Sequence, residues 1–219
     1  MAESPQRPWV SALIAAAVLG IFAVIGASLV GVSYEATTDR IVQNEKQALL
    51  DQLNAILPSG EYDNRLLQDY FDVQAAQELG AEQTRVYRAR KAGSPVAVLL
   101  SPVVAKGYNG AIRLVVGIRE DGRLAGVRVL SQKETPGLGD KIDIQKSDWI
   151  LGFEGKSLDN PSQAKWKVRR DGGVFDQFTG ATITPRGVVA AVHKALVYYQ
   201  ANKDKLFNTE SIYQEPDNG

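Results

Sequence analysis

The chain has 219 residues, of which 25 are basic and 25 acidic, so its net charge is close to zero. This balance excludes the broad positive field that gathers nucleic-acid phosphates, and we expect no nucleic-acid partner. There is no cysteine, which excludes disulfides, thiolate zinc sites, cysteine-ligated iron–sulfur clusters and CxxCH haem attachment, so electron transfer by this chain would need an organic cofactor.

The first expected element is a membrane-spanning helix over residues 9–34. The segment from Trp9 to Val32 carries no charge, and a helix of that length spans about 36 Å. Trp9 and Tyr34 bracket it, as is typical of aromatic residues at membrane interfaces. A cleaved signal peptide and a buried core helix are the alternatives. The apolar run is longer than a signal-peptide core, although residues 26–28 resemble a small-residue cleavage site.

Few charges indicate the orientation of this anchor. Arg7, in a short tail of residues 1–8, precedes it, whereas Arg40 and Lys46 follow it among acidic residues. The excess of positive charge on cytoplasmic loops weakly favours a cytoplasmic N-terminus. The rest of the chain would then be extracytoplasmic.

A helical stalk is expected after the anchor, with packing helices up to residue 82. Apolar residues recur near helical spacing until Pro58 and Gly60 break the pattern. These apolar residues are Ile41, Ala48, Leu49, Leu53 and Ile56. Residues 61–82 are predicted to form a second, more polar helical stretch.

Four short runs rich in valine, isoleucine and leucine predict an antiparallel sheet. They are Val86–Arg90, Val96–Leu100, Ile112–Ile118 and Leu124–Leu130. Turn residues separate them, and the Glu120–Arg123 step with its glycine is typical of a hairpin.

A long amphipathic helix is predicted to cover this sheet. Thr184 suits its N-cap and Pro185 its first position. Its apolar face comprises Val188, Val192, Ala195, Leu196 and Tyr199. The predicted fold class is therefore α+β, with one transmembrane helix, a single domain over residues 83–207 and a C-terminal tail over residues 208–219.

Two glycine-containing loops are the candidate functional sites. Glu134–Gly139, read ETPGLG, either brings backbone close to a flat ligand or is an ordinary Pro-Gly turn. Asp176–Thr182, read DQFTGAT, precedes the long helix and, with Thr184, offers three threonine hydroxyls, while Gly180 and Ala181 leave its backbone uncrowded. A helix N-terminus favours an anion such as phosphate, but a simple capping loop uses the same residues, so both interpretations stay open.

DQFTGAT resembles the flavinylation motif of the FMN-binding domain family, and ETPGLG resembles the second hallmark of that family. KGYNG, at residues 106–110, and a VGI strand precede them in the family's order. The resemblance implies that Thr182 carries FMN through a phosphoester bond on its side-chain oxygen. One departure concerns Ser131-Gln132-Lys133, where relatives often have a histidine, and this puts a histidine contact in doubt.

The chain resembles the G subunits of Rnf electron-transport complexes in its single anchor, its length and the order of its elements. The C subunits of sodium-translocating NADH:quinone reductases share the motifs and the anchor but are usually longer, so they are the second candidate family. The resemblance implies a single-pass protein of the bacterial inner membrane with its flavin domain on the periplasmic side. It implies other membrane subunits as partners, an extracytoplasmic flavin transferase that uses FAD and magnesium, and coupling of ferredoxin/NAD electron transfer to ion translocation. A lone FMN reductase and a non-redox membrane-anchored adaptor are the alternatives.

The resemblance also assigns roles to residues. The expected cofactor-binding residues are Thr182, Asp176, Thr179, Gly180, Ala181, Thr184, Glu134, Thr135, Gly137, Leu138 and Gly139. The ETPGLG loop would contact the ring, and Asp176 would serve the modification step or hold its loop by backbone hydrogen bonds. Candidates for nearby positive charge are Lys141, Lys167 and Arg169. We expect no catalytic residue and no metal ligand. We interpret His193 as a surface or packing residue, and Trp149 and Trp166 as core packing residues, with lining of the flavin pocket as the alternative.

Overall fold

The computed structural model describes residues 8–213. Residues 1–7 and 214–219 lie outside the described part, and with them Arg7 and most of the two expected tails. The chain divides into two compact units, Met1–Gln47 and Ala48–Gly219.

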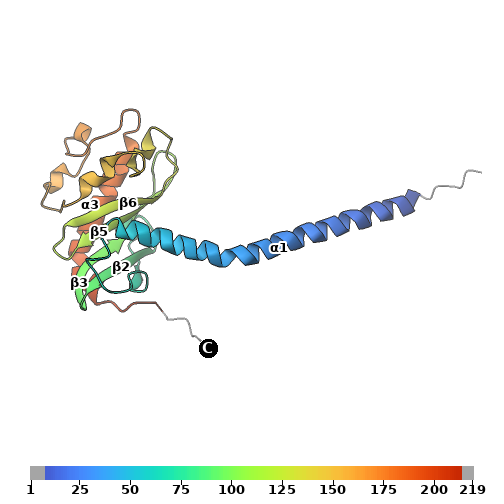
Figure 1. Ribbon diagram of the computed structural model, residues 1–219. Helices are drawn as coiled ribbons and strands as arrows, with labels where there is room; N and C mark the ends of the chain where they lie inside the picture. The colour runs from blue at the N-terminus through green and yellow to red at the C-terminus, as the bar shows by residue number, and fades with distance from the viewer. Residues whose placement is uncertain (1–7, 214–219) are drawn as a thin grey trace, which may run out of the picture. The chain divides into compact units, whose positions relative to one another are not determined.

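The first unit consists of the helix α1, which spans Pro8–Asn54 and continues into the second unit (Figure 1). Within it, Ala12–Val32 has a mean hydropathy of 2.7 and is long enough to cross a membrane. None of this window is buried against protein, which differs from a core helix of a soluble domain. The predicted anchor and the predicted stalk are therefore parts of one uninterrupted helix.

The second unit is built on a six-stranded antiparallel sheet. Its strands are β1 (Tyr70–Val73), β2 (Thr84–Lys91), β3 (Ser94–Leu100), β4 (Val103–Val104), β5 (Ile112–Arg119) and β6 (Leu124–Ser131). β1, β2 and β3 pair in sequence order. β3 and β4 then share one side of β5 at different positions, and β6 pairs with its other side. All four predicted strands and the 120–123 hairpin are confirmed, with each strand one or more residues longer.

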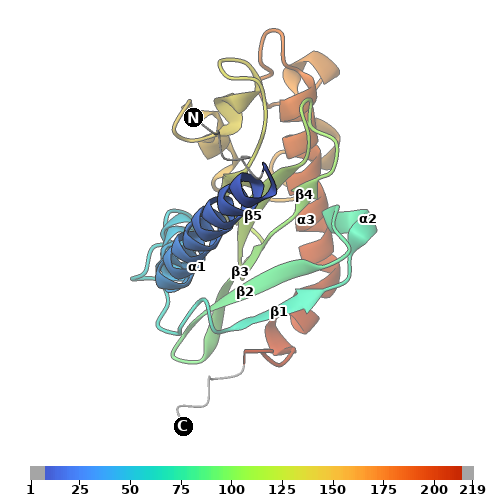
Figure 2. The ribbon, with the colours of Figure 1, turned by 90° about the vertical axis from the view of Figure 1, so that its right-hand side faces the viewer.

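Short helices follow β6, and a long helix ends the domain. The short ones are the 3-10 helices η1 (Gly139–Ile142), η2 (Asp148–Phe153), η3 (Gln163–Lys165) and η4 (Arg169–Asp171). The long helix α3 spans Ile183–Asn208 and lies along one face of the sheet (Figure 2). A short helix α2 (Ala76–Leu79) packs against α3.

Two hydrophobic cores lie on the two faces of the sheet. One lies between the sheet and α3, and the other lies beneath the last turns of α1. The alternation of strand side chains explains this division, since Val86 faces α3 and Tyr87 faces Leu53 and its neighbours on the other side. The predicted α+β class, a sheet covered by helices, is confirmed.

The structure corrects two predictions from the sequence. Residues 61–82 are not a helical stretch, because Tyr70–Val73 form the edge strand β1 and only Ala76–Leu79 are helical. Phe71 and Val73 point from β1 into the core, and this pairing with β2 starts the sheet ahead of residue 83. The second correction concerns α3, which begins at Ile183 with Thr182 at the N-cap position.

Two arginines close the C-terminal end of α3. Arg88 is buried and pairs with Asp69 at 2.5 Å, and it also donates to the carbonyl oxygens of Phe207 and Thr209. Arg90 donates to the Phe207 carbonyl at 2.5 Å and to the same aspartate at 3.0 Å. These cations satisfy carbonyls that a helix end leaves unpaired and complement its negative dipole end.

Candidate functional site

The ETPGLG loop leaves the end of β6 as a tight turn. The Leu138 amide donates to the Thr135 carbonyl at 3.1 Å, which closes a four-residue turn. Pro136 occupies its second position and Gly137 its third, with a φ of 78°. This is the arrangement of a type II turn, whose third position favours glycine. The Pro-Gly turn expected from composition is thus present, and it presents Leu138, which is 41% exposed.

The DQFTGAT loop contains a turn of the same design just before α3. The Ala181 amide donates to the Phe178 carbonyl at 3.1 Å, and Gly180, again in the third position, has a φ of 82°. A Cβ atom at Gly180 would lie 3.7 Å from Leu138 Cδ2. The tips of the two loops, more than forty residues apart in sequence, therefore lie close together.

Glu134 lies beneath both loops. Its side chain is buried, and one carboxylate oxygen accepts a short hydrogen bond from the hydroxyl of Thr184 in the first turn of α3. The other oxygen accepts from the backbone amide of Asn109 at 3.0 Å. The Glu134 amide in turn donates to the side chain of Gln132 at 2.6 Å. Glu134 thus connects the KGYNG loop, the ETPGLG loop and the start of α3, and it does so from inside the domain.

The three threonine hydroxyls differ in availability. Thr184 is fully buried, and its hydroxyl is bonded to Glu134. Thr179 is exposed on its turn. Thr182 is partly exposed, makes no side-chain cap to the helix, and has no hydrogen bond from its hydroxyl to any described residue. Thr182 therefore combines a fixed backbone, at the first turn of α3, with a free hydroxyl.

Aromatic packing supports the DQFTGAT loop from behind. The indole N–H of Trp149 donates to the Asp176 carbonyl at 2.8 Å, and its ring centroid lies 5.2 Å from that of Phe178. Trp166 is buried in the same core, where His193 stacks on it at 5.6 Å between centroids. Trp166 and His193 therefore pack in the core, and Trp149 packs at its edge and also fixes the DQFTGAT loop.

Ion pairs tie the same loop to its neighbours. Arg169 of η4 pairs with the Asp176 carboxylate at 3.0 Å, so this carboxylate meets a cation in place of the backbone amides that the sequence led us to expect. Asp171, also in η4, pairs with Arg186 of α3 at 2.5 Å. This hydrogen-bonded guanidinium lowers the pKa of Asp171. Both guanidinium groups near the DQFTGAT loop are therefore paired with carboxylates.

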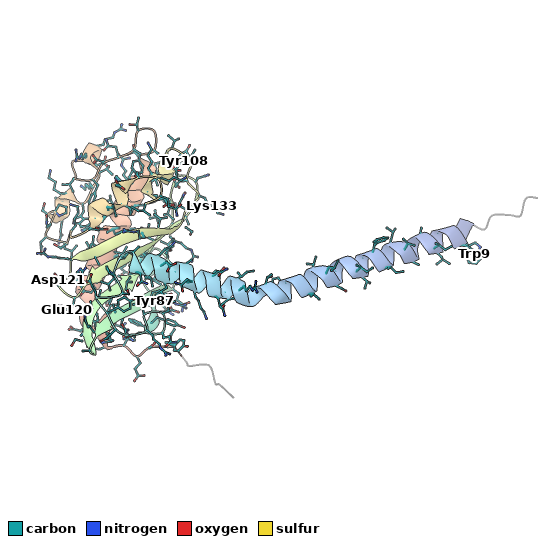
Figure 3. The ribbon with its side chains drawn as sticks, in the orientation of Figure 1. Trp9, Tyr87, Tyr108, Glu120, Asp121 and Lys133 are labelled. Carbon is teal, nitrogen blue, oxygen red and sulfur yellow. The ribbon has the colours of Figure 1, made fainter. Side chains whose placement is uncertain are left out.

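Exposed apolar side chains lie next to Thr182 and on the facing loops. Ile183 follows it directly and is 50% exposed, and Leu138 projects from the facing turn. Tyr108, in the KGYNG loop, is also exposed and lies at the same end of the domain as Lys133 (Figure 3), whose carbonyl accepts from Asn109 Nδ2 at 2.8 Å. Such a surface suits a planar, partly apolar ring that is tethered nearby.

Several members of this site were not found from the sequence. Asn109 and Arg186 act through contacts with residues 25 and 15 positions away, whereas Gln132 accepts from the amide of Glu134 two residues on. Asn109 belongs to the KGYNG motif, but no local pattern in the sequence indicates the contact that it makes. Asp140, next to Gly139, is buried with one carboxylate oxygen unpartnered among the described residues. Among residues 8–213 no three His, Asp or Glu side chains cluster as metal ligands do. A free hydroxyl, nearby guanidinium groups and an apolar surface fit FMN, whose phosphate is anionic and whose ring is flat.

Comparison with known proteins gives the family. Residues 107–197 match the family model of the FMN-binding domain, and residues 4–56 match that of the RnfG N-terminal region. Similar relatives are named as the G subunit of the ion-translocating oxidoreductase complex. They include proteins of Pseudoalteromonas atlantica (45% identical, 89% of this chain and 91% of the relative), Pseudomonas aeruginosa (48%, 89% and 92%) and Vibrio atlanticus (49%, 86% and 90%).

Fold and site therefore define an FMN-binding domain on a membrane anchor. The chain belongs to the family of G subunits of ion-translocating oxidoreductase complexes. It is accordingly an electron-transfer subunit of such a complex, with FMN as its cofactor and other subunits as its partners. These relatives favour this family over the C subunits of sodium-translocating reductases. Family membership and the apolar helix together indicate membrane anchoring.

Proposed function

We propose that FMN is attached covalently to the side-chain oxygen of Thr182 through a phosphoester bond. The observation that carries this proposal is the free, partly exposed hydroxyl of Thr182, in contrast to the buried and hydrogen-bonded hydroxyl of Thr184 two residues on. The closeness of the DQFTGAT and ETPGLG turns supports it, because a ring tethered at one turn would lie near the other.

Electrostatics at the start of α3 support a phosphate there. The first amides of a helix lack intrahelical partners, and the helix dipole adds about half a positive charge at this end. Arg186 lies four residues after Thr182, on the same side of the helix, and its amide donates to the Thr182 carbonyl at 3.3 Å. Arg169 shields the charge of Asp176 from the phosphate. An acidic residue in the motif is therefore compatible with an anionic cofactor.

FAD is the donor of the FMN group in the attachment reaction. The Thr182 oxygen forms a bond to the phosphorus of the FMN half, the pyrophosphate bond breaks, AMP leaves and the hydroxyl proton is released. A separate extracytoplasmic flavin transferase with magnesium would carry out this step. The attached flavin supplies single-electron transfer, which is the cofactor's own chemistry. The chain positions it. Thr179, Gly180 and Ala181 form the tether's turn, Thr135, Gly137 and Leu138 would line the ring, and the buried Gly139 would hold the loop against Glu134.

We further propose that the N-terminus is cytoplasmic and that the flavin domain is periplasmic, on the bacterial inner membrane. The weak charge bias around the anchor and the need for an extracytoplasmic transferase support this orientation. The domain would then pass electrons within a complex that couples ferredoxin/NAD electron transfer to ion movement. In this arrangement the chain carries electrons and has no substrate chemistry of its own.

Denaturing gel fluorescence tests the attachment. The full chain is expressed with a flavin transferase, alongside Thr182→Val and the control Thr209→Val, which changes the threonine at the opposite, C-cap end of α3. We expect a fluorescent band for wild type and for the control, and none for Thr182→Val. Flavin that is present in the native protein but lost in SDS would establish non-covalent binding instead. A native protein without flavin would refute the proposed site as a whole.

A further inference from the structure

The first turn of α3 is held by a distant carboxylate. Helix N-termini commonly use the N-cap side chain to satisfy a free amide, but Thr182, at this position, makes no such bond. The Thr184 hydroxyl points instead to Glu134, fifty residues earlier in the chain. The start of α3 is therefore held in place by Glu134, a side chain of the ETPGLG loop.

Two glycines enclose the Glu134 carboxylate. A Cβ atom at Gly139 would lie 2.6 Å from one carboxylate oxygen and 2.9 Å from the Thr184 hydroxyl. A Cβ atom at Gly107 would lie 2.7 Å from the other oxygen, the one that accepts from the Asn109 amide. These distances are too short for a real side chain, so the carboxylate fits only because positions 107 and 139 are glycines.

The Glu134 carboxylate is held by two hydrogen-bond donors and by no ion pair among the described residues. An ionised carboxylate accepts stronger hydrogen bonds than a neutral group does, and here one donor is an amide and the other a hydroxyl. Within residues 8–213 no Lys, Arg or His forms an ion pair with Glu134. The Glu134 carboxylate lies next to the positive end of α3, because the Thr184 hydroxyl that it binds is in the first turn of this helix.

We propose that Glu134, acting through Thr184, is a positioning residue for flavin attachment. It fixes the first turn of α3 so that the Thr182 hydroxyl, two residues before Thr184, stays free and points to the incoming phosphate. The proposal rests on Thr182 as the attachment residue. It predicts that attachment depends on the Thr184 hydroxyl even though that hydroxyl is buried and never meets the flavin.

The test compares attachment rates in full-chain protein with a flavin transferase and FAD, measured as fluorescence that survives SDS. Thr184→Val removes the hydroxyl at nearly constant shape and should slow attachment at least about tenfold, since small misplacements of a reacting group have effects of that order. Thr184→Ser restores the hydroxyl and should recover most of the rate. Glu134→Gln should also slow attachment, and the double variant Glu134→Gln/Thr184→Val should be no slower than the worse single variant.

Tyr199→Phe is the matched control for stability. It removes one hydrogen bond, 3.0 Å from the Tyr199 hydroxyl to the Glu120 carbonyl, in the C-terminal half of α3 and away from its first turn. We expect this variant to accept flavin at the wild-type rate despite a lower Tm. Normal attachment in Thr184→Val, or an equal loss in Tyr199→Phe, would overturn the positioning role. Absence of flavin on Thr182 in wild type would instead refute the attachment itself, so the two failures are distinct.

Discussion

A single methyl group at Gly139 tests the packing beneath the two loops. Alanine there would place its Cβ 2.6–2.9 Å from the Glu134 carboxylate oxygen, the Glu134 Cβ and the Thr184 hydroxyl. Gly139 is not in the left-handed region, so crowding alone sets the effect. Overpacking of this kind costs about 1–3 kcal/mol, which corresponds to a Tm decrease of roughly 2–12 °C for a domain of this size.

Gly152→Ala is the matched control, because Gly152 also lies in a 3-10 helix but its Cβ position has no atom within 4 Å beyond its chain neighbours and its own helix backbone. Reduced freedom of the unfolded chain should make this change neutral or stabilising by about 0.4–1 kcal/mol. Thermal unfolding of the full chain in detergent, followed by tryptophan fluorescence, measures both variants. Equal Tm values for the two alanine variants would refute the close packing of Glu134 against the backbone.

Three further predictions concern stability and pH. Arg88→Met breaks the buried ion pair with Asp69 and should lower the free energy of unfolding by about 3–5 kcal/mol, measured by chemical denaturation. Arg85→Met breaks a more exposed pair with Asp72 and should lower it by at most about 1 kcal/mol. Similar decreases for the two variants would contradict this account. Trp149→Phe removes the hydrogen bond to the Asp176 carbonyl, so the free energy of unfolding should fall by about 0.5–1.5 kcal/mol and the flavin-to-protein ratio should decrease. An unchanged ratio would show that flavin loading does not need this bond. Burial lowers the pKa of His193. The unfolded chain therefore binds a proton more readily than the folded one, and stability should fall as the pH drops below about 6.5. His193→Phe should weaken this dependence of the free energy of unfolding on pH, and an unchanged dependence would argue against this role.

The sheet was predictable because its information is local. Each predicted strand is a run of β-branched and leucine residues bounded by turn residues, and the glycine at 122 marks the hairpin between β5 and β6. β1 was missed because a four-residue edge strand buries only Phe71 and Val73, too few to show alternation. The polar residues around it made a helical interpretation equally acceptable.

The site was predictable only in part, since its contacts join distant residues. Both loops and their glycines could be located from the sequence, and Pro136-Gly137 even indicates the type of turn. The N-cap was misplaced because the Thr184 hydroxyl, which suits a cap, is bonded to Glu134 instead. Likewise, nothing local in the sequence indicates that the glutamate of ETPGLG points inward.

The most direct test of covalent attachment at Thr182 is the mass of the tryptic peptide 171–186 from the full-chain protein made with its flavin transferase. This peptide contains Thr179, Thr182 and Thr184. We predict that it carries the added mass of FMN less water and that fragmentation assigns this mass to Thr182. An unmodified peptide from flavin-containing protein, or the added mass on either of the other two threonines, would contradict the proposed attachment.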